Sequence, residues 1–412
     1  MSLPRLIEIL PVTGPLNAEV VVPGSKSMTN RALIIAAQAV GYTTIRGALW
    51  SDDTQVMVEC LQKLGIGIET FEDETVPSNR TFRVLGWGGK VPVREAELYV
   101  GNAGTTARFI TAFCALSEGS YRIYGTPRMH QRPMEQLFRI LSGWGIQFEF
   151  EEQAGHLPIR MSVPKELQMP STVTVDLSKS SQFASALELI RPHFGFTIQP
   201  EGFDDDGYYQ LTKAMARKPS SEITIEPDAS SATYFWAAAS LFPGSDVRIK
   251  NWPSTSLQLD SKFAEMVKFK PMKLSRRTDL GDSVMMAAVL GSLWPRGFSV
   301  TDAGRLREQE TDRLAALEKE LNKCGGKVKA WPTWLEISAV PELHGAEIET
   351  YDDHRMAMAF SILGLKVPGM VIRNAQCVTK TLPNFYELLE DMVRQSGHGP
   401  VVIDAKTRKP VL

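Results

Sequence analysis

The sequence predicts an α/β (α+β) protein of two globular domains, each built from three copies of one repeated unit. Three observations favour this class. A short loop of Gly, Ser, Asn or Asp repeatedly leads into an Ala-rich apolar run, a β-branched segment follows, and an amphipathic segment often closes the unit. The chain has 412 residues, which is enough for two domains with sizeable cores. The six loops begin at Gly24, Gly101, Ser178, Pro227, Leu280 and Tyr351.

Each unit supplies its own helices and strands. The Ala-rich run behind each loop predicts one helix, and apolar residues at i, i+3 and i+4 predict further half-buried helices. Segments rich in Val, Ile, Thr and Tyr predict the strands. The amphipathic helices are expected within residues 54–69, 133–149, 313–329 and 385–393, and strands within 43–49, 120–125, 246–251, 298–304 and 369–375. Six units imply three per domain, with a boundary near Pro227–Asp228.

Composition and charge exclude several classes of function. The chain is 43% hydrophobic and 22% charged, with a formal net charge of −2, so it lacks the basic surface of a nucleic-acid-binding protein. The N-terminus has no basic flank followed by an apolar stretch, and no apolar run approaches a membrane span. We therefore expect a cytoplasmic protein with no membrane or nucleic-acid partner. The cysteines lack metal-site spacing and are expected to be reduced thiols, at Cys60, Cys114, Cys324 and Cys377.

The first loop places two cations at the start of a predicted helix. Lys26 lies in a Gly/Ser turn before an Ala-rich run, and Arg31 follows about one turn later. Cations oppose the helix dipole there, whereas anions bind well to a helix N-terminus. The arrangement therefore indicates an anionic ligand. A P-loop is excluded because the motif needs Gly before the lysine, where this chain has Ser25, so ATP is not expected.

Two later motifs in the first half are compatible with anion binding. Gly101 and Gly104 allow close approach of the backbone to a ligand, although an ordinary Gly-rich turn is an equally good explanation. Arg128 and Arg132 surround a Pro-bounded loop and have the fork geometry that suits carboxylate or phosphate. A solvated surface pair is the alternative.

Three motifs in the second half carry charge at predicted helix starts. Asp282 opens an otherwise apolar helix, as a candidate acid–base group or an ordinary N-cap. Glu310 and Arg313 are three residues apart and would share one helix face, in a run that an exposed charged helix start also explains. His354 and Arg355 precede a Met-rich apolar helix, again against the dipole preference.

Together these motifs resemble those of the enolpyruvyl transferase family, in the same order and over nearly the whole chain. They are PGSKSMTNRAL, GNAGTTARF, PRMHQRP, SSQFASAL, DASSATYF, QETDRL, YDDHRMAMAF and CVTKTLPNF. The resemblance implies two domains of three βαβαββ-type units, with the active site in the cleft between them. The N-terminal segment would return to the second domain, which gives residues 1–23 plus 228–412 for one domain and 24–227 for the other.

The resemblance is strongest to the members that use shikimate 3-phosphate. It implies a transferase that moves the enolpyruvyl (1-carboxyvinyl) group of phosphoenolpyruvate to the 5-hydroxyl of shikimate 3-phosphate and releases phosphate, on the shikimate pathway to chorismate and aromatic amino acids. Four anionic substrate groups would explain the unfavourably placed cations. The family implies a monomer without metal or organic cofactor. It also implies competitive inhibition by glyphosate at Gly104, although Phe109 stands where many members have Pro.

Site residues follow from the resemblance motif by motif. Asp282 would take the hydroxyl proton, Glu310 would handle the carbon-bound proton, and Lys26 with Arg313 would neutralise the leaving phosphate. The residues expected to bind shikimate 3-phosphate are Lys26, Ser27, Arg31, Ser180, Ser181, Gln182, Tyr208, Asp282 and Gln309. Those expected to bind phosphoenolpyruvate are Lys26, Asn102, Gly104, Arg128, Gln182, Arg313, His354, Arg355 and Lys380.

Three departures from the family pattern keep other functions open. Gln309 replaces a common lysine, Asp205 replaces a common serine, and Arg305 replaces a common asparagine and would restore the lost charge. A different hydroxyl acceptor, or a catalytically idle binding protein of the same fold, are the alternatives. The relatives that use UDP-N-acetylglucosamine carry a cysteine near the position of Arg128, and this loop has none. The related RNA 3′-phosphate cyclases would need a histidine that handles ATP and a more basic surface.

Overall fold

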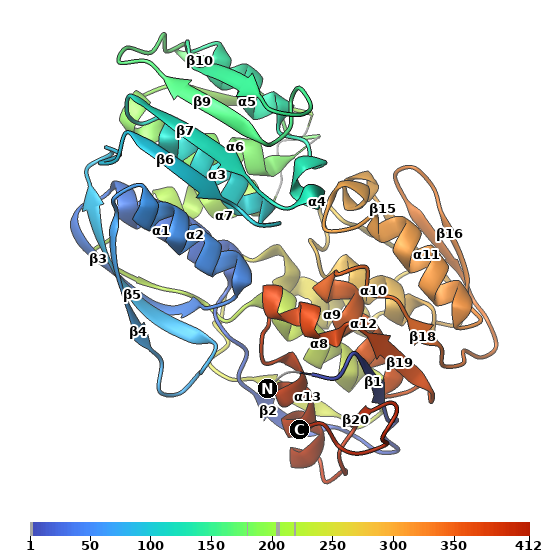
Figure 1. Ribbon diagram of the computed structural model, residues 1–412. Helices are drawn as coiled ribbons and strands as arrows, with labels where there is room; N and C mark the ends of the chain where they lie inside the picture. Colours follow the sequence, from blue (N-terminus) through green and yellow to red (C-terminus); the bar gives the residue numbers. More distant parts are fainter. Residues whose placement is uncertain (1–2, 179, 203–206, 218–219) are drawn as a thin grey trace. The chain divides into compact units, whose positions relative to one another are not determined.

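The chain forms two compact units (Figure 1). The computed structural model describes residues 3–178, 180–202, 207–217 and 220–412. Unit 1 is discontinuous and consists of Met1–Pro23 and Pro227–Leu412, and unit 2 is the continuous segment Gly24–Glu226. Asp205, which departs from the family pattern, lies outside the described residues. Each unit has its own buried apolar core.

Unit 2 alternates helices and strands along the chain. Its helices are α1 (Lys26–Gln38), α2 (Asp52–Lys63), α3 (Gly104–Cys114), α4 (Pro127–His130), α5 (Glu135–Ser142), α6 (Ser181–Phe194) and α7 (Gly207–Ala216). Its strands are β3 (Val40–Leu49), β4 (Gly67–Glu72), β5 (Asn79–Trp87), β6 (Glu95–Tyr99), β7 (Gly119–Tyr124), β8 (Gln147–Phe150), β9 (Ile159–Val163), β10 (Thr172–Asp176), β11 (Thr197–Glu201) and β12 (Glu222–Thr224).

Unit 1 repeats this plan with elements from both ends of the chain. Its helices are α8 (Ala229–Ser240), η1 (Leu259–Lys262), α9 (Phe263–Lys268), α10 (Val284–Gly291), η2 (Gly304–Glu308), α11 (Arg313–Lys323), α12 (His354–Gly364), η3 (Ala375–Lys380) and α13 (Phe385–Gln395), where η marks a 3₁₀ helix. Its strands are β1 (Leu6–Ile9), β2 (Asn17–Val20), β13 (Asp246–Ile249), β14 (Lys273–Ser275), β15 (Phe298–Thr301), β16 (Lys327–Ala330), β17 (Leu335–Ser338), β18 (Glu347–Ile348), β19 (Met370–Arg373) and β20 (Val402–Asp404).

The sheets show that the units are built from repeats. Within the described ranges, each unit has two four-stranded sheets and one two-stranded sheet. Each four-stranded sheet starts with a parallel pair and continues with two antiparallel pairings, and both two-stranded sheets are parallel. The strand orders are β12-β3-β5-β4, β6-β7-β9-β8 and β10-β11 in unit 2, and β14-β15-β17-β16, β18-β19-β1-β20 and β13-β2 in unit 1. The α/β fold class read from the repeats is confirmed.

The predicted Ala-rich helices are confirmed as α1, α3, α6, α8, α10 and α12. Within unit 2, α1, α3 and α6 pack against one another, and within unit 1 the same holds for α8, α10 and α12. Small side chains permit this close packing, and α10 and α12 are buried along their whole length. A polar side chain starts several of these helices by accepting a backbone N–H bond, at Ser25, Ser180, Asp228 and Asp353. The polar first turns therefore belong to the most buried helices of each unit.

Two local predictions in unit 1 are wrong. Asp282 does not open the apolar helix, because α10 begins at Val284 and Ser283 occupies its N-cap position. Glu310 and Arg313 do not share a helix face, because α11 begins only at Arg313. The Asp312 carboxylate caps that helix by accepting a hydrogen bond from the Ala315 N–H at 3.0 Å, so the preceding residues stay outside the helix.

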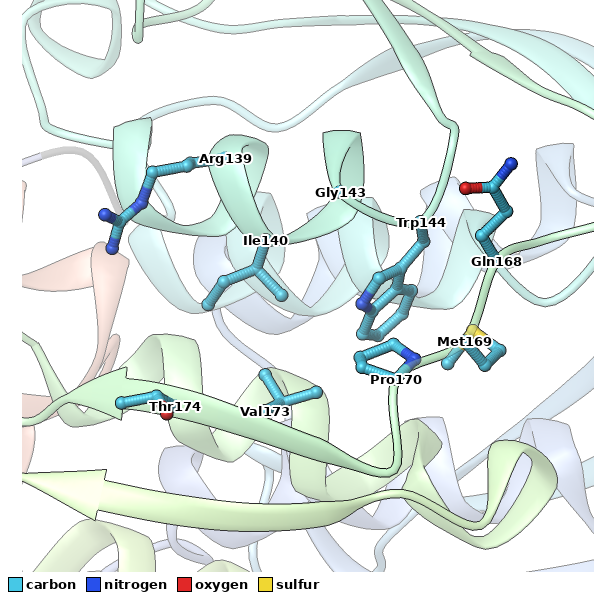
Figure 2. Close-up of a pocket in the computed structure, with 9 residues that line it drawn as sticks. All are labelled: Arg139, Ile140, Gly143, Trp144, Gln168, Met169, Pro170, Val173 and Thr174. Atoms are coloured by element: carbon cyan, nitrogen blue, oxygen red, sulfur yellow. The ribbon is translucent and has the colours of Figure 1, made fainter.

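A groove of about 630 Å³ lies in unit 2 between α5 and β10, and Figure 2 shows its lining residues. The side chains of Ile140, Trp144, Pro170 and Val173 gather in its middle. None of the residues predicted to bind substrate lines this groove. In the described ranges no helix is long and apolar enough to cross a membrane, and no three His, Cys, Asp or Glu side chains gather as metal ligands would.

Candidate active site

The predicted site residues form two groups, one in each unit. The group in unit 2, here called the helix-end site, lies at or next to helix N-termini and comprises Lys26, Ser27, Arg31, Asn102, Gly104, Arg128, Ser180, Ser181, Gln182 and Tyr208. The group in unit 1, here called the arginine cluster, comprises Arg276, Asp282, Gln309, Glu310, Arg313, Asp353, His354, Arg355 and Lys380. Arg276 and Asp353 are included in the arginine cluster because they contact Asp282 and Arg313 in the structure.

Lys26 is the first residue of α1 and points toward the start of α2. Its ammonium group donates a hydrogen bond to Asp53 Oδ2 at 3.0 Å, and both side chains are largely buried. The backbone oxygen of Asp53 accepts a bond from the Thr106 hydroxyl at 3.4 Å, in the first turn of α3. These contacts bring the N-termini of α1, α2 and α3 together. Asp53 offsets the unfavourable position of Lys26 at the positive end of the α1 dipole.

Arg31 is buried and links α1 to α6 and α7. Its guanidinium donates to Thr212 Oγ1 at 2.7 Å and to the backbone oxygens of Ser27 at 2.8 Å and Tyr208 at 3.1 Å. It also approaches Ser185 Oγ at 3.4 Å. Arg31 therefore fixes the backbone of Ser27 and of Tyr208, two other predicted site residues. Charge-assisted bonds of this kind are stronger than neutral ones, so the junction is rigid.

Gly104 begins α3 against two buried arginines. A Cβ atom on Gly104 would lie 2.4 Å from Arg108 Nη1 and 2.5 Å from Arg132 Nη2, so a larger residue would displace both guanidinium groups. Arg108 donates to the Gly104 oxygen at 3.0 Å, and Arg132 donates to the Asn102 oxygen at 2.8 Å. Two cations thus stand directly behind this helix start. Arg132, one of the two arginines noted in the PRMHQRP motif, thus contacts the Gly-rich loop.

The start of α6 adjoins the start of α3. Ser180 caps α6 by accepting a bond from the Gln182 N–H at 3.2 Å, and the Gln182 amide reaches Thr105 Oγ1 at 3.5 Å. Ser181 is the first residue of α6 and is buried. Arg128 lies in the short helix α4, where it donates to Gln131 Oε1 at 3.1 Å. A backbone bond from Thr126 N to Gly101 O at 2.9 Å holds that segment beside the Gly-rich loop.

Contacts within unit 2 thus join the N-termini of α1, α2, α3 and α6. The first N–H groups of a helix have no partner inside the helix and carry the positive end of its dipole. The helix-end site combines these donors with lysine and arginine side chains. Such a surface can bind an anion with several oxygen atoms, such as a phosphate or a carboxylate.

Asp282 is the centre of the arginine cluster. Its Oδ1 accepts a bond from Arg276 Nη2 at 3.1 Å, and its Oδ2 accepts one from Arg355 Nη2 at 3.1 Å. Arg313 Nη1 lies 3.9 Å from Oδ1, and the Gln309 amide nitrogen lies 3.5 Å from it. Burial opposes ionisation, but Arg355, Arg313 and Arg276 together hold the pKa of Asp282 far below its usual value. Asp282 is therefore an ionised carboxylate that accepts hydrogen bonds on both oxygens.

Arg313 and Asp353 form a fully buried ion pair beneath it. Arg313 Nε and Nη2 donate to the two carboxylate oxygens of Asp353 at 2.7 and 3.1 Å. Asp353 is 0% exposed and also caps α12 through the Arg355 N–H at 2.9 Å. Burial opposes the charge on Arg313, yet Asp353, Glu310 and Asp282 raise its pKa above the usual value. One carboxylate therefore orients both Arg313 and the backbone of Arg355.

Glu310 contacts Arg313 at the same guanidinium nitrogen, Nη2, that donates to Asp353 Oδ1. Glu310 Oε2 is 2.9 Å from Arg313 Nη2, and Oε1 is 4.0 Å from Lys380 Nζ. Gln309 accepts a bond from Arg313 as well, so this amide bridges Arg313 and Asp282. The predicted residues Asp282, Glu310 and Lys380 thus meet around one arginine, although they come from different segments.

His354 adjoins Asp353, and Arg305 precedes Gln309 in the chain. His354 is the first residue of α12, is buried, and has Nδ1 3.8 Å from Asp353 Oδ1. Arg305 is half-buried in η2, four residues before Gln309. The sequence missed Arg276, which is buried against Asp282 although SRRTDL resembles an exposed charged turn. It also missed Asp53, since neither residue belongs to a recognisable motif.

Comparisons with known proteins agree on one family over most of the chain. The family model described as EPSP synthase (3-phosphoshikimate 1-carboxyvinyltransferase) matches residues 11–203 and 192–389. A 3-phosphoshikimate 1-carboxyvinyltransferase of Nostoc punctiforme is 34% identical, over 94% of this chain and 99% of the relative. The solved structure of EPSP synthase from Acinetobacter baumannii has a similar fold, with a TM-score of 0.73 at 21% identity over 97% of this chain and 99% of that one. The enolpyruvyl transferase NikO from Streptomyces tendae has a similar fold as well, with a TM-score of 0.68 at 17% identity over 96% of this chain and 98% of that one.

Proposed function

The chain belongs to the EPSP synthase (3-phosphoshikimate 1-carboxyvinyltransferase) family, and on that premise we propose how its two groups of residues divide the reaction. The protein transfers the enolpyruvyl group of phosphoenolpyruvate to the 5-hydroxyl of shikimate 3-phosphate and releases inorganic phosphate. The observation that carries the assignment of residues is the arginine cluster, in which Asp282 and Glu310 share Arg313. Two carboxylates at one cation are suited to two separate proton transfers.

The helix-end site supplies most of the binding of shikimate 3-phosphate. Its phosphate is bound by Ser180, Ser181 and Gln182 at the start of α6, where the helix N-terminus favours an anion. Lys26 contacts both substrates, and Ser27 and Arg31 bind the shikimate side, with Arg31 at the carboxylate. Tyr208 lies near the shikimate ring, and Asp282 and Gln309 are the contacts from unit 1.

Phosphoenolpyruvate is bound by cations of both groups. Its carboxylate and phosphate are bound by Arg313, Arg355 and Lys380 from the arginine cluster, with His354 beside them. Asn102, Gly104, Arg128, Lys26 and Gln182 are the contacts from the helix-end site. Gln309 takes the place of a lysine in the family pattern, and its amide, hydrogen-bonded to Arg313 and Asp282, keeps a donor without adding a charge.

The chemistry requires one proton to leave the 5-hydroxyl and one to enter the methylene carbon of phosphoenolpyruvate. Asp282 accepts the hydroxyl proton as the oxygen attacks C2, while Glu310 donates a proton to C3, which gives a tetrahedral intermediate. Glu310 then removes a proton from C3, the double bond forms again, and the C2–O bond to phosphate breaks, while the proton held by Asp282 passes to the departing phosphate. Lys26 and Arg313 neutralise the charge that develops on the leaving phosphate.

The pKa of Asp282 makes this sequence depend on the presence of substrate. Three arginines stabilise the ionised form, so the carboxylate is a weak base in the cluster as it stands. When Arg313 and Arg355 bind substrate anions, their positive charge is shared and negative charge is added nearby. Both changes raise the pKa of Asp282 and increase its basicity at the stage where the hydroxyl is present.

The direct test is phosphate release from phosphoenolpyruvate with shikimate 3-phosphate as acceptor. Parallel reactions contain shikimate or UDP-N-acetylglucosamine, and D282N and E310Q are the catalytic controls. We expect release only with shikimate 3-phosphate, and in each control a loss on the order of 100-fold or more in kcat. Release with another acceptor, or silence with all three, would refute the proposed function.

Three further properties belong to the same proposal. Glyphosate competes with phosphoenolpyruvate, because the absence of a Cβ at Gly104 lets the guanidinium groups of Arg108 and Arg132 lie directly against this helix start. The protein acts as a monomer in the cytoplasm. Steady-state inhibition at varied phosphoenolpyruvate tests the first property, and light scattering after size-exclusion chromatography tests the oligomeric state. Activity unaffected by millimolar glyphosate, or a dimer mass, would contradict these statements.

A further inference from the structure

Arg276 is a buried arginine outside every motif that the family resemblance supplies. It follows β14 directly, and its backbone N–H donates to the Thr301 oxygen at 2.9 Å, which fixes its main chain against β15. Its side chain crosses to Asp282, where Nη2 donates to Oδ1 at 3.1 Å. Arg276 is only 6% exposed, so this contact is shielded from water.

The three arginines around Asp282 differ in their other interaction partners. Arg313 is also paired with Asp353 and Glu310, and Arg355 lies in the first turn of α12 and contacts the other carboxylate oxygen. Across the part of the chain that the structure describes, the Arg276 side chain has Asp282 as its one hydrogen-bond or ion-pair partner. Its Nε atom is buried without a partner, which is unfavourable. Because the Arg276 side chain contacts one carboxylate, its role is to orient that carboxylate and to stabilise its charge.

We propose that Arg276 is a positioning residue for proton transfer, which orients the Asp282 carboxylate and keeps it ionised while Arg313 and Arg355 bind substrate anions. This inference rests on the proposed function, in which Asp282 accepts the hydroxyl proton. Arg276 holds Oδ1 and leaves Oδ2, the oxygen on the Arg355 side, to meet the substrate hydroxyl. Because Arg276 binds no substrate in this assignment, its contact with Asp282 persists through the reaction.

Asp260 holds the chain on either side of Asp282, whereas Arg276 holds the Asp282 carboxylate. Asp260 in η1 accepts bonds from the Gly281 N–H at 2.7 Å and from the Ser283 hydroxyl at 2.6 Å, on either side of Asp282. Burial raises the pKa of Asp260, although its bonds to Ser230 and Ser283 act in the opposite direction. The Glu310 carboxylate opposes ionisation of Asp282. Because Asp260 anchors this loop independently, loss of the Arg276 side chain leaves the backbone of Asp282 in place.

The test compares R276M and R276K with wild type and with R296M, a matched control that removes an exposed arginine of the same unit. Phosphate release with phosphoenolpyruvate and shikimate 3-phosphate is measured across pH, together with KM for both substrates and the midpoint of thermal unfolding. We expect R276M to lower kcat on the order of 10- to 100-fold with little change in either KM, because the base is misoriented. Removing one cation also raises the pKa of Asp282, so the acid limb of kcat moves to higher pH.

The outcomes separate this inference from the proposed function. R276K retains a cation and should recover part of kcat and move the acid limb back toward that of wild type, whereas R296M should behave as wild type. An active wild type together with an R276M enzyme of normal kcat and pH profile would overturn this inference alone. A lower unfolding midpoint with an unchanged pH profile would show a merely structural role and overturn it as well. An inactive wild type would overturn the proposed function and this inference with it.

Discussion

The buried pair of Arg313 and Asp353 allows a sharp test of what holds the arginine cluster together. Replacing Asp353 with Asn removes the negative charge but keeps an oxygen that can cap α12 at the Arg355 N–H. Arg313 then loses the carboxylate that binds both its Nε and Nη2 atoms and keeps Glu310 and Asp282 as counter-charges, in a site where only 1% of its side chain is exposed. Removing one partner of a buried ion pair is expected to reduce the free energy of unfolding by about 3–5 kcal/mol. Replacing Asp353 with Ala also removes the cap, which adds about 1 kcal/mol.

Urea unfolding followed by tryptophan fluorescence and circular dichroism measures these changes. The double variant D353N/R313M should be less destabilised than the sum of the single variants, with a coupling of about 1–3 kcal/mol, because the buried arginine that lost its bidentate partner is gone. D246N is the matched control, since it breaks an ion pair between exposed side chains, Asp246 and Arg248, and should have no measurable effect. A loss under about 1 kcal/mol in D353N, or strict additivity with R313M, would refute the reasoning.

Three further predictions follow from the same geometry. G104A places a methyl group 2.4 Å from Arg108 Nη1 and 2.5 Å from Arg132 Nη2, so we expect a higher KM for phosphoenolpyruvate and a still larger rise in the glyphosate inhibition constant. Equal values of both constants in G104A and wild type would contradict this prediction. The pKa of Asp282 is lower in the folded than in the unfolded protein, so its ionisation stabilises the fold above the usual pKa of 3.8, and this contribution is lost as the pH falls below it. D282N should flatten the acid dependence of the unfolding midpoint, and an unchanged slope would refute the assignment. Burial raises the pKa of Cys60 to about 12, so this thiol should react with a disulfide reagent only after denaturation, and rapid labelling of the native protein would show otherwise.

Local sequence patterns predicted the repeated elements well. Polar loops before Ala-rich runs located the six helices α1, α3, α6, α8, α10 and α12, because capping and helical periodicity are properties of neighbouring residues. The strands around Ile45, Ile123, Val300 and Ile372 followed from β-branched content for the same reason. Patterns among residues close in the sequence therefore predict where each helix or strand begins and ends.

Contacts between distant segments were outside the reach of those patterns. Lys26 and Asp53 are 27 residues apart, and Asp282 and Arg355 are 73 residues apart, so no local periodicity connects them. Arg276 could not be predicted as a site residue either, because an arginine in a polar turn is normally exposed. Glu310 was paired with Arg313 by helical spacing, and the pair exists without a shared helix because the chain turns before α11. The family resemblance identified the functional residues, but the contacts between them could be found only from the structure.

The position of β1 has a consequence for how the chain matures during synthesis. β1 lies between β19 and β20, with Ile7 opposite both Ile372 and Asp404. Unit 2 is continuous in sequence and can fold as soon as its own residues have emerged from the ribosome. Strand β1, by contrast, precedes unit 2 in the chain and has to wait for β19 and β20 before its sheet is complete. While unit 2 and most of unit 1 are being synthesised, β1 therefore lacks both of its sheet partners, which gives chaperones a long time to bind it.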